Sequence, residues 1–100
     1  MEKILCAAIW YVDFDKPIHS PLNTETGVVM CGFRHSHIIG QCLSLLNKKQ
    51  SEMFDYEQGF LTSANRFVSR KEAFIIAKRE GQILDLALTK NETLYSEDLY

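Results

Sequence analysis

The sequence predicts an α+β fold, in which two α-helices pack on one face of a small, mostly antiparallel β-sheet. Three observations predict it. Two apolar, strand-like segments come first with nothing helical between them; a segment with helical spacing of its apolar residues follows; a short strand then leads into a well-capped second helix. A chain of 100 residues has the size of one ordinary domain, so we expect residues 1–100 to form a single domain.

The first two strands are expected on either side of a long loop. Residues Lys3–Val12 are apolar on both faces of a strand, which is typical of a central position in a sheet. Residues 13–26 contain Pro17, Pro21 and many small polar residues, so they predict a loop. Gly27–Phe33 predicts the second strand. Without a helix between them, the two strands should pair antiparallel.

The first helix is expected at Arg34–Lys49, opened by His35 or Ser36, and the third strand at Phe60–Ser63. Residues 50–57 mix acidic and aromatic side chains and fit no single pattern. The apolar stripe of the predicted helix has the spacing i, i+3, i+4, i+7, i+10 and i+11. Its members are His35, Ile38, Ile39, Cys42, Leu45 and Leu46.

The second helix is expected at Arg70–Glu80 because its two ends carry capping signals. Ser69 and Glu72 have the spacing of a capping box, in which each side chain binds a backbone N–H of the first turn. Gly81 stands where a helix C-cap should. Residues 83–88 fit either a short strand or a continuation of the helix, and the tail to residue 100 has little periodicity.

The predicted sheet has apolar residues on both faces, but the two helices cover only one. We therefore expect a homo-oligomer, either a dimer or an assembly of dimers. Ile75 supports a subunit contact, because at 100° per residue it points away from the apolar face of the helix, toward Lys71, Lys78 and Arg79.

Composition and charge exclude several classes of protein. Hydrophobic residues make up 46% of the chain and charged residues 24%, which is typical of a soluble globular protein. The formal net charge of -2 argues against a binder of DNA or RNA polymers, which usually carries a basic surplus. The apolar run Ile4–Val12 is too short to span a membrane and lacks the flanks of a signal peptide.

Three cysteines, Cys6, Cys31 and Cys42, lie within apolar runs and form no C-x-x-C pair. Free cysteine is among the most buried residue types, and disulfides are rare in the cytosol. We therefore expect reduced core cysteines in a cytosolic protein.

Candidate ligand-binding residues gather at two places. Arg34 lies between a strand end and a helix start, where a guanidinium can bind a phosphate with two hydrogen bonds. The polar run Thr62–Arg66 precedes the N-terminus of the second helix, a natural place for an anion. A nucleotide base could stack on the ring of Phe60, whereas Phe67 fits a core position at the helix start. The alternative to ligand binding is an exposed salt bridge for Arg34 and an ordinary polar loop for Thr62–Arg66.

The sequence supports a catalytic or metal site less well than a ligand-binding site. His35 and His37 diverge at a helix start and have no third ligand at a suitable spacing, so we predict no metal; a packed His35 and a ligand-contacting His37 fit better. The chain has no G-x-S-x-G, P-loop or G-x-G-x-x-G motif, so no cofactor is expected. Asp13 and Asp15 could form an acid–base pair, although carboxylates at a loop start are more often solvated.

Three strings resemble a family of small bacteriophage proteins related to the phage anti-Thoeris sponge proteins, which sequester signals of the cyclic ADP-ribose type. They are CGFRHSHII, QGFLTSANRFVSRKEAFIIAKREGQ and LYSEDLY, and together they cover about half of the chain. The resemblance implies an oligomer with ligand pockets near subunit interfaces, and pockets built from arginines, an aromatic ring and an asparagine. On this sequence those residues would be Arg34, Phe60, Asn65 and Arg66, with Arg70 or Arg79 supplied by a neighbouring subunit.

The combined expectation is a non-enzymatic phage anti-defence protein in the cytoplasm of the infected host. It would bind a nucleotide immune signal, either a cyclic ADP-ribose variant or a cyclic oligonucleotide. A nucleotide- or ADP-ribose-processing enzyme that uses His37 or Asp15, and a protein inhibitor of a host defence factor, are the alternatives. The expected ligand-binding residues are Arg34, His37, Phe60, Thr62, Asn65, Arg66, Arg70 and Arg79.

Overall fold

The computed structural model describes residues 1–12, 20–46, 56–89 and 91–100. The elements follow one another as β1 (Ile4–Tyr11), β2 (Val28–Gly32), α1 (His35–Leu46), β3 (Tyr56–Thr62), β4 (Phe67–Ser69) and α2 (Arg70–Arg79), then the short 3-10 helices η2 (Leu86–Leu88) and η3 (Ser96–Asp98). The four strands form one antiparallel sheet in the order β2-β1-β3-β4. The predicted α+β class, the central first strand and its antiparallel pairing with the second are confirmed.

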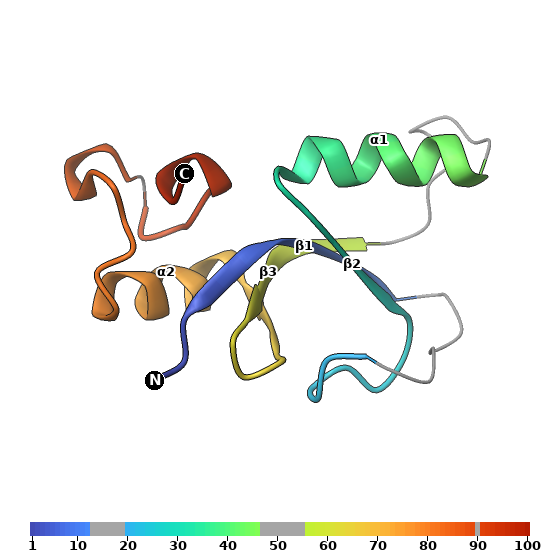
Figure 1. Ribbon diagram of the computed structural model, residues 1–100, viewed down its shortest axis with the longest axis horizontal. Helices are drawn as coiled ribbons and strands as arrows, with labels where there is room; N and C mark the ends of the chain where they lie inside the picture. The colour runs from blue at the N-terminus through green and yellow to red at the C-terminus, as the bar shows by residue number, and fades with distance from the viewer. Residues whose placement is uncertain (13–19, 47–55, 90) are drawn as a thin grey trace.

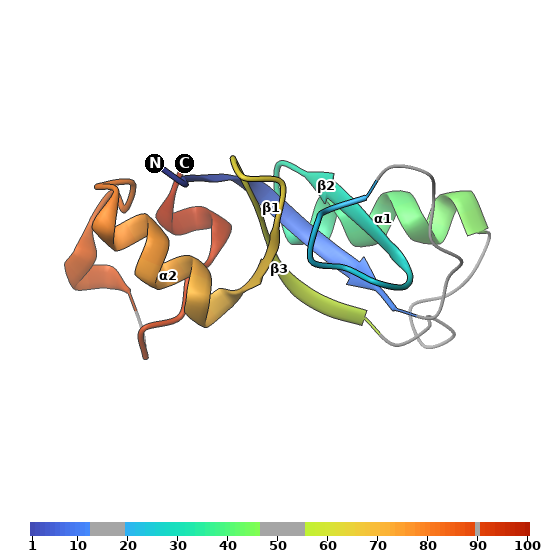
Figure 2. The same ribbon diagram turned by 90° about the horizontal axis from the view of Figure 1, so that it is seen from below.

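The register of the sheet explains how both helices share one core. Ala7 of β1 pairs with Phe60 of β3, which pairs with Val68 of β4, so their side chains point to the same face. Figures 1 and 2 place α1 toward one end of the molecule and α2 toward the other. The helix residues that join this core are Ile38 and Cys42 from α1 and Ala73, Phe74, Ile76 and Ala77 from α2.

Three expectations about the second half of the chain need correction. The third strand begins at Tyr56, not Phe60, and so extends into a stretch whose pattern fitted no element. The strand β4 was not predicted, because three residues are too few to show an alternating pattern. Residues 83–88 form neither a strand nor a continued α-helix: η2 follows a turn at Gly81, whose φ is 68°.

The opposite face of the sheet is covered in part by residues 20–27. The side chain of Asn23 binds both the N–H and the carbonyl oxygen of Phe67, at 2.8 and 2.6 Å. Trp10 donates its indole N–H to the carbonyl of Thr26 at 2.8 Å and lies against the ring of Phe67, with ring centroids 5.8 Å apart. These contacts occupy the outer edge of β4, which would otherwise expose unpaired backbone groups.

The cysteines only partly follow the prediction of three core thiols. All three are free, and Cys42 is buried among core residues. Cys31 is exposed and Cys6 half-buried, because both lie on the sheet face that the helices leave open. The expectation was therefore wrong for Cys31.

Candidate functional site

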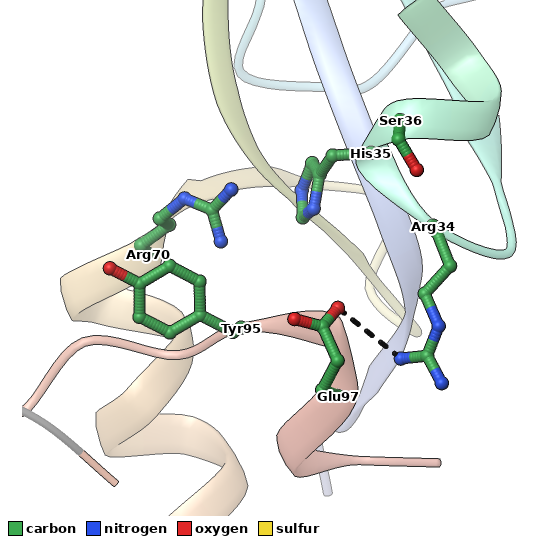
Figure 3. Close-up of a pocket in the computed structure, with 6 residues that line it drawn as sticks. All are labelled: Arg34, His35, Ser36, Arg70, Tyr95 and Glu97. Carbon is green, nitrogen blue, oxygen red and sulfur yellow. Dashed lines mark ion pairs between the residues drawn. The ribbon is translucent and has the colours of Figure 1, made fainter.

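A pocket of about 230 Å³ lies at the start of α1 (Figure 3). Three segments that are far apart in the sequence build it: the start of α1, the first residue of α2, and the C-terminal segment. Figure 1 shows this segment beside α2 and close to the beginning of α1. The lining residues are Arg34, His35, Ser36, Arg70, Tyr95 and Glu97.

Arg34 reaches this pocket because β2 ends two residues earlier and the chain turns directly into α1. Its carbonyl accepts hydrogen bonds from the N–H groups of His37 and Ile38, so it closes the first helical turn. The first N–H groups of any α-helix have no acceptor within the helix, and here they belong to His35 and Ser36. The pocket therefore lies at the partly positive end of α1.

The Arg34 guanidinium is held by the C-terminal segment. Its Nη2 donates to the carbonyl of Tyr100, and its carbon atom Cζ lies 4.6 Å from the ring centroid of Phe33 and 5.0 Å from that of Tyr100. The Nη1 atom is buried and makes no hydrogen bond within the part of the chain that the structure describes. Its ion pair with the Glu97 carboxylate is long, at 3.5 Å, which leaves donor capacity on Arg34.

Arg70 supplies the second positive charge of the pocket. It donates to the carbonyl of Leu94 at 3.0 Å and to the side-chain oxygen of Gln58 at 2.5 Å, and it lies over the ring of Tyr95, 4.6 Å from the centroid. Burial lowers its pKa, but a guanidinium still carries its charge at neutral pH. A second anion near Arg70 would offset the cost of burying that charge.

His35 forms a wall of the pocket and is neutral at pH 7. Burial is the main cause that lowers its pKa, and its Nε2 lies 2.7 Å from the carbonyl oxygen of Gly59. Its ring meets that of Phe60 edge-on, with centroids 5.1 Å apart. The prediction of a packed His35 is confirmed.

Glu97 places one negative charge against the two arginines. A hydrogen bond from Ser96 is the main cause that lowers its pKa, and the charges of Arg34 and Arg70 lower it further. With His35 neutral, these side chains leave the pocket with one net positive charge. Two guanidinium groups and a helix start can bind an anion, and a carboxylate can accept hydrogen bonds from sugar hydroxyls.

Of the eight residues predicted to contact a ligand, the structure places Arg34 and Arg70 in this pocket. His37 is exposed and stacks on Phe33, with ring centroids 6.1 Å apart, and it does not line the pocket. Phe60 is completely buried, so its ring faces are closed to a ligand. Arg79 pairs with its neighbour Glu80 at 3.2 Å.

The loop Thr62–Arg66 has a folding role that its sequence did not reveal. The Thr62 hydroxyl oxygen accepts hydrogen bonds from the N–H groups of Ala64 and Arg66, and it donates to the Glu2 carboxylate at 2.7 Å. Asn65 has a positive φ of 57° and completes the tight turn between β3 and β4. Folding therefore accounts for this polar run, and none of its residues lines the pocket.

Arg66 itself binds a carboxylate within the chain. Its Nε and Nη2 atoms donate to the two oxygens of Glu2 at 2.8 and 2.9 Å, and its Nη1 lies 3.6 Å from Glu72. Arg66 does not line the pocket that Arg34 lines.

Sequence reasoning missed Tyr95 and Glu97, since the C-terminal segment has no periodicity that would place it. Asp13 and Asp15, the alternative acid–base pair, fall outside the described residues. Among the described residues, no cluster of three or more metal-binding side chains occurs. None of the helices in the described ranges has the length and apolar character needed to cross a membrane.

Comparison with known proteins identifies one family. Residues 3–100 match the family model described as Phage T4 y16D protein. No curated protein and no solved structure matches the chain significantly.

Proposed function

The chain belongs to the Phage T4 y16D protein family, and from this membership and the pocket at the start of α1 we propose that it binds a nucleotide immune signal of the infected host and withholds it without turning it over. The ligand would be a cyclic ADP-ribose variant or a cyclic oligonucleotide. The protein would act in the host cytoplasm as a homo-oligomer.

The observation that carries this proposal is the convergence of Arg34 and Arg70 at a helix N-terminus. Both residues line the pocket, and Figure 3 shows them on opposite sides of it, with the Glu97 carboxylate between their guanidinium groups. Planar guanidinium groups match the geometry of phosphate oxygens, and a helix start adds N–H donors. A phosphate is the common anionic group of all the proposed ligands.

The size of the pocket bears on how much of a ligand it holds. Pockets that enclose a drug-sized molecule measure about 300–1,000 Å³, whereas this one measures about 230 Å³. A phosphate with its sugar matches that volume better than a whole cyclic dinucleotide. The remainder of the ligand would lie on the surface or against a second subunit, which agrees with the proposed oligomer.

Binding without turnover is supported by the chemistry of the lining residues. Ser36 is the only hydroxyl-bearing aliphatic side chain among them, and no base hydrogen-bonds to it within the described ranges. The adjacent His35 is neutral, and its Nε2 is engaged by Gly59. His37, proposed as the base of the alternative enzyme, points its ring onto Phe33 instead.

Calorimetric titration with cyclic ADP-ribose isomers, cyclic di- and trinucleotides and inorganic phosphate tests the proposal. We expect saturable binding of a nucleotide, recovered unchanged after the protein is denatured. Arg70→Gln should weaken binding about 10- to 100-fold, because a hydrogen bond to a charged group contributes about 1.5–3 kcal/mol. Lys71→Gln is the matched control: it changes the next residue of α2, which is exposed and outside the pocket.

Absence of binding by all these compounds would overturn the proposal, and so would an equal loss in the two variants. Recovery of a chemically altered nucleotide would favour the enzyme.

A protein inhibitor of a host factor is the second candidate, favoured by a specific observation. Ile75, Leu84 and Leu88 expose 63%, 70% and 69% of their surface, although each is a large apolar residue. Ile75→Asp should then abolish capture of the host protein while Arg70→Gln leaves it intact; the nucleotide proposal expects the opposite pattern for ligand binding.

A further inference from the structure

Two thiols lie side by side on the open face of the sheet. Cys31 of β2 stands directly opposite Ala8 of β1, and Cys6 precedes Ala8 by two residues. Alternate residues of a strand point to the same face, so Cys6 and Cys31 form a diagonal pair on neighbouring strands. Cys31 is exposed and Cys6 is half-buried, so reagents in solution can reach the pair.

The ionisation of each thiol depends on the other. A hydrogen bond from Cys31 lowers the pKa of the Cys6 thiol to about 7, although partial burial acts in the opposite direction. The same hydrogen bond is the main cause that raises the pKa of Cys31, because donating it stabilises the protonated thiol; burial and the negative charge of Cys6 raise it further. Cys6 is therefore the thiol that ionises first.

The third cysteine offers an internal comparison. Cys42 is buried in the core on the helical side of the sheet, and its Sγ lies 2.9 Å from the sulfur of Met30. A thiol enclosed by apolar side chains is inert, whereas a reactive one is ionised and accessible. Only Cys6 and Cys31 combine access with a neighbouring thiol among the described residues.

We propose that Cys6 and Cys31 form a redox-active dithiol, in which Cys6 attacks a low-molecular-weight disulfide and Cys31 converts the product into a disulfide between β1 and β2. In the first step the Cys6 thiolate bonds to one sulfur of the small disulfide and releases the other half as a thiolate. In the second step Cys31 loses its proton to solvent and attacks the Cys6 sulfur, releasing the second half. The protein loses two electrons and two protons, and the small disulfide becomes two thiols.

The backbone around the pair has to shift for the disulfide to close. Diagonal residues of an antiparallel pair lie roughly 7–8 Å apart at Cα, slightly beyond the usual range of about 4.4–6.8 Å for a disulfide. Closing the bond needs a small shift of the strands. The sheet is irregular between Ile4 and Cys6, where β1 carries a bulge against β3, and β2 ends at Gly32, directly after Cys31. Both cysteines thus lie where a ladder is interrupted or ends.

Oxidation here would reach the proposed ligand pocket. Ala7, next to Cys6, donates its N–H to the Tyr100 hydroxyl at 3.3 Å, and Tyr100 holds the Arg34 guanidinium. Arg34 also follows Cys31 by three residues. A shift of β1 against β2 would therefore move both Tyr100, which contacts β1, and the end of β2, from which the chain continues to Arg34. The dithiol chemistry itself does not depend on the proposed function.

Thiol reactivity tests the assignment in the full-length protein. The folded protein is incubated with oxidised glutathione and analysed by intact-mass spectrometry after acid quenching. Wild type and Cys42→Ser should each lose two hydrogen atoms by forming the internal disulfide. Cys31→Ser should retain one glutathione on Cys6, because it lacks the resolving thiol. Cys6→Ser should remain largely unmodified.

The pH dependence of alkylation by iodoacetamide adds a measurement that needs no disulfide. Cys6 should reach half its maximal rate near pH 7, whereas an ordinary thiol does so near its pKa of about 8.5. At pH 7 the larger thiolate fraction, corrected for the lower nucleophilicity of a more acidic thiol, gives a rate advantage of about threefold. Cys31→Ser should move the Cys6 profile to higher pH.

Three results would overturn the proposal, provided that circular dichroism shows each variant folded. One is a wild-type protein that stays fully reduced in excess oxidised glutathione. Another is a wild type that keeps glutathione on Cys6 without closing the internal bond. The third is a Cys6 alkylation profile that Cys31→Ser leaves unchanged.

Discussion

The ion pair between Glu2 and Arg66 tests most directly whether the loop between β3 and β4 serves the fold. Replacing Glu2 by Gln removes the negative charge but keeps a side chain of similar shape. The carboxylate accepts two hydrogen bonds from Arg66 and one from Thr62, at 2.8, 2.9 and 2.7 Å. The hydrogen bond from Arg66, followed by that from Thr62, lowers the pKa of Glu2 from 4.5 to about 2.

The magnitude follows from linkage and from exposure. A pKa lowered from 4.5 to about 2 corresponds to about 3.4 kcal/mol of stabilisation at most. The side chains of Arg66 and Glu2 are 36% and 20% exposed, so solvent screening reduces this value. We expect Glu2→Gln to lower the free energy of unfolding by about 1–2 kcal/mol, or the midpoint temperature by about 5–15 °C.

The pH dependence identifies the cause of the loss. Since the pKa of Glu2 is lower in the folded state, its contribution is complete above pH 4.5 and disappears as the pH falls through about 2. Urea denaturation of wild type and Glu2→Gln at several pH values should show the two curves converging in acid. Glu72→Gln is the control: Glu72 is 46% exposed and 3.6 Å from Arg66, so a change within about 0.5 kcal/mol is expected. A Glu2→Gln protein as stable as wild type at pH 7, or a difference that persists unchanged in acid, would refute the reasoning.

Two further predictions concern glycine packing and the ionisation of His35. Gly59→Ala should prevent folding or cost several kcal/mol in urea denaturation, because a Cβ there would lie 2.1 Å from the Val68 carbonyl oxygen and 2.7 Å from the Phe67 ring; Gly40→Ala, with nothing within 4 Å, should instead stabilise α1 by about 0.5–1 kcal/mol. Equal effects of the two changes would contradict the packing. Burial lowers the folded-state pKa of His35, so its contribution to stability is present above pH 6.5 and is lost as the pH falls below that value; His35→Phe should flatten this slope, and an unchanged slope would contradict the assignment.

Periodicity accounts for the parts of the fold that could be predicted. The runs at Lys3–Val12 and Arg34–Lys49 are long enough to show which faces are apolar. The structure places β1 in the first run with each end one residue shorter, and α1 begins one residue after Arg34; the predicted end of this helix lies outside the described residues. The helix α2 was bounded well because Ser69 caps it, accepting a hydrogen bond from the Glu72 N–H at 3.2 Å. The strand β4 was not predicted, because it is recognised by its pairing with β3 and its short sequence shows no alternating pattern.

Less of the candidate site than of the fold could be predicted from the sequence. Arg34 could be proposed from the sequence, since it stands between a strand end and a helix start. Arg70 was suggested only by the family resemblance, as a residue of a neighbouring subunit, whereas the structure places it in the pocket of the same chain. The residues that complete the pocket come from a segment whose position depends on contacts across 24 to 66 residues of chain, as between Arg70 and Leu94 or Arg34 and Tyr100. The polar run Thr62–Arg66 was wrongly predicted to bind a ligand, because its polar groups form hydrogen bonds within their own turn and with Glu2. Residue types alone do not show these partners.

The C-terminal segment both completes the core and builds the pocket, and this limits how a ligand can enter. Leu94 is fully buried, and exposing it would cost about 1.5–3 kcal/mol. Lifting the segment would also break the hydrogen bonds that Arg70 and Arg34 donate to the carbonyls of Leu94 and Tyr100, each contributing about 1.5–3 kcal/mol because its donor is charged. A ligand that displaced the segment would have to offset all of this before it gained affinity. A ligand that uses the remaining donors of Arg34 and Arg70 leaves the segment in place, so its binding does not carry this free-energy cost. The pocket should therefore be filled as it stands, by a phosphate-bearing group small enough for about 230 Å³.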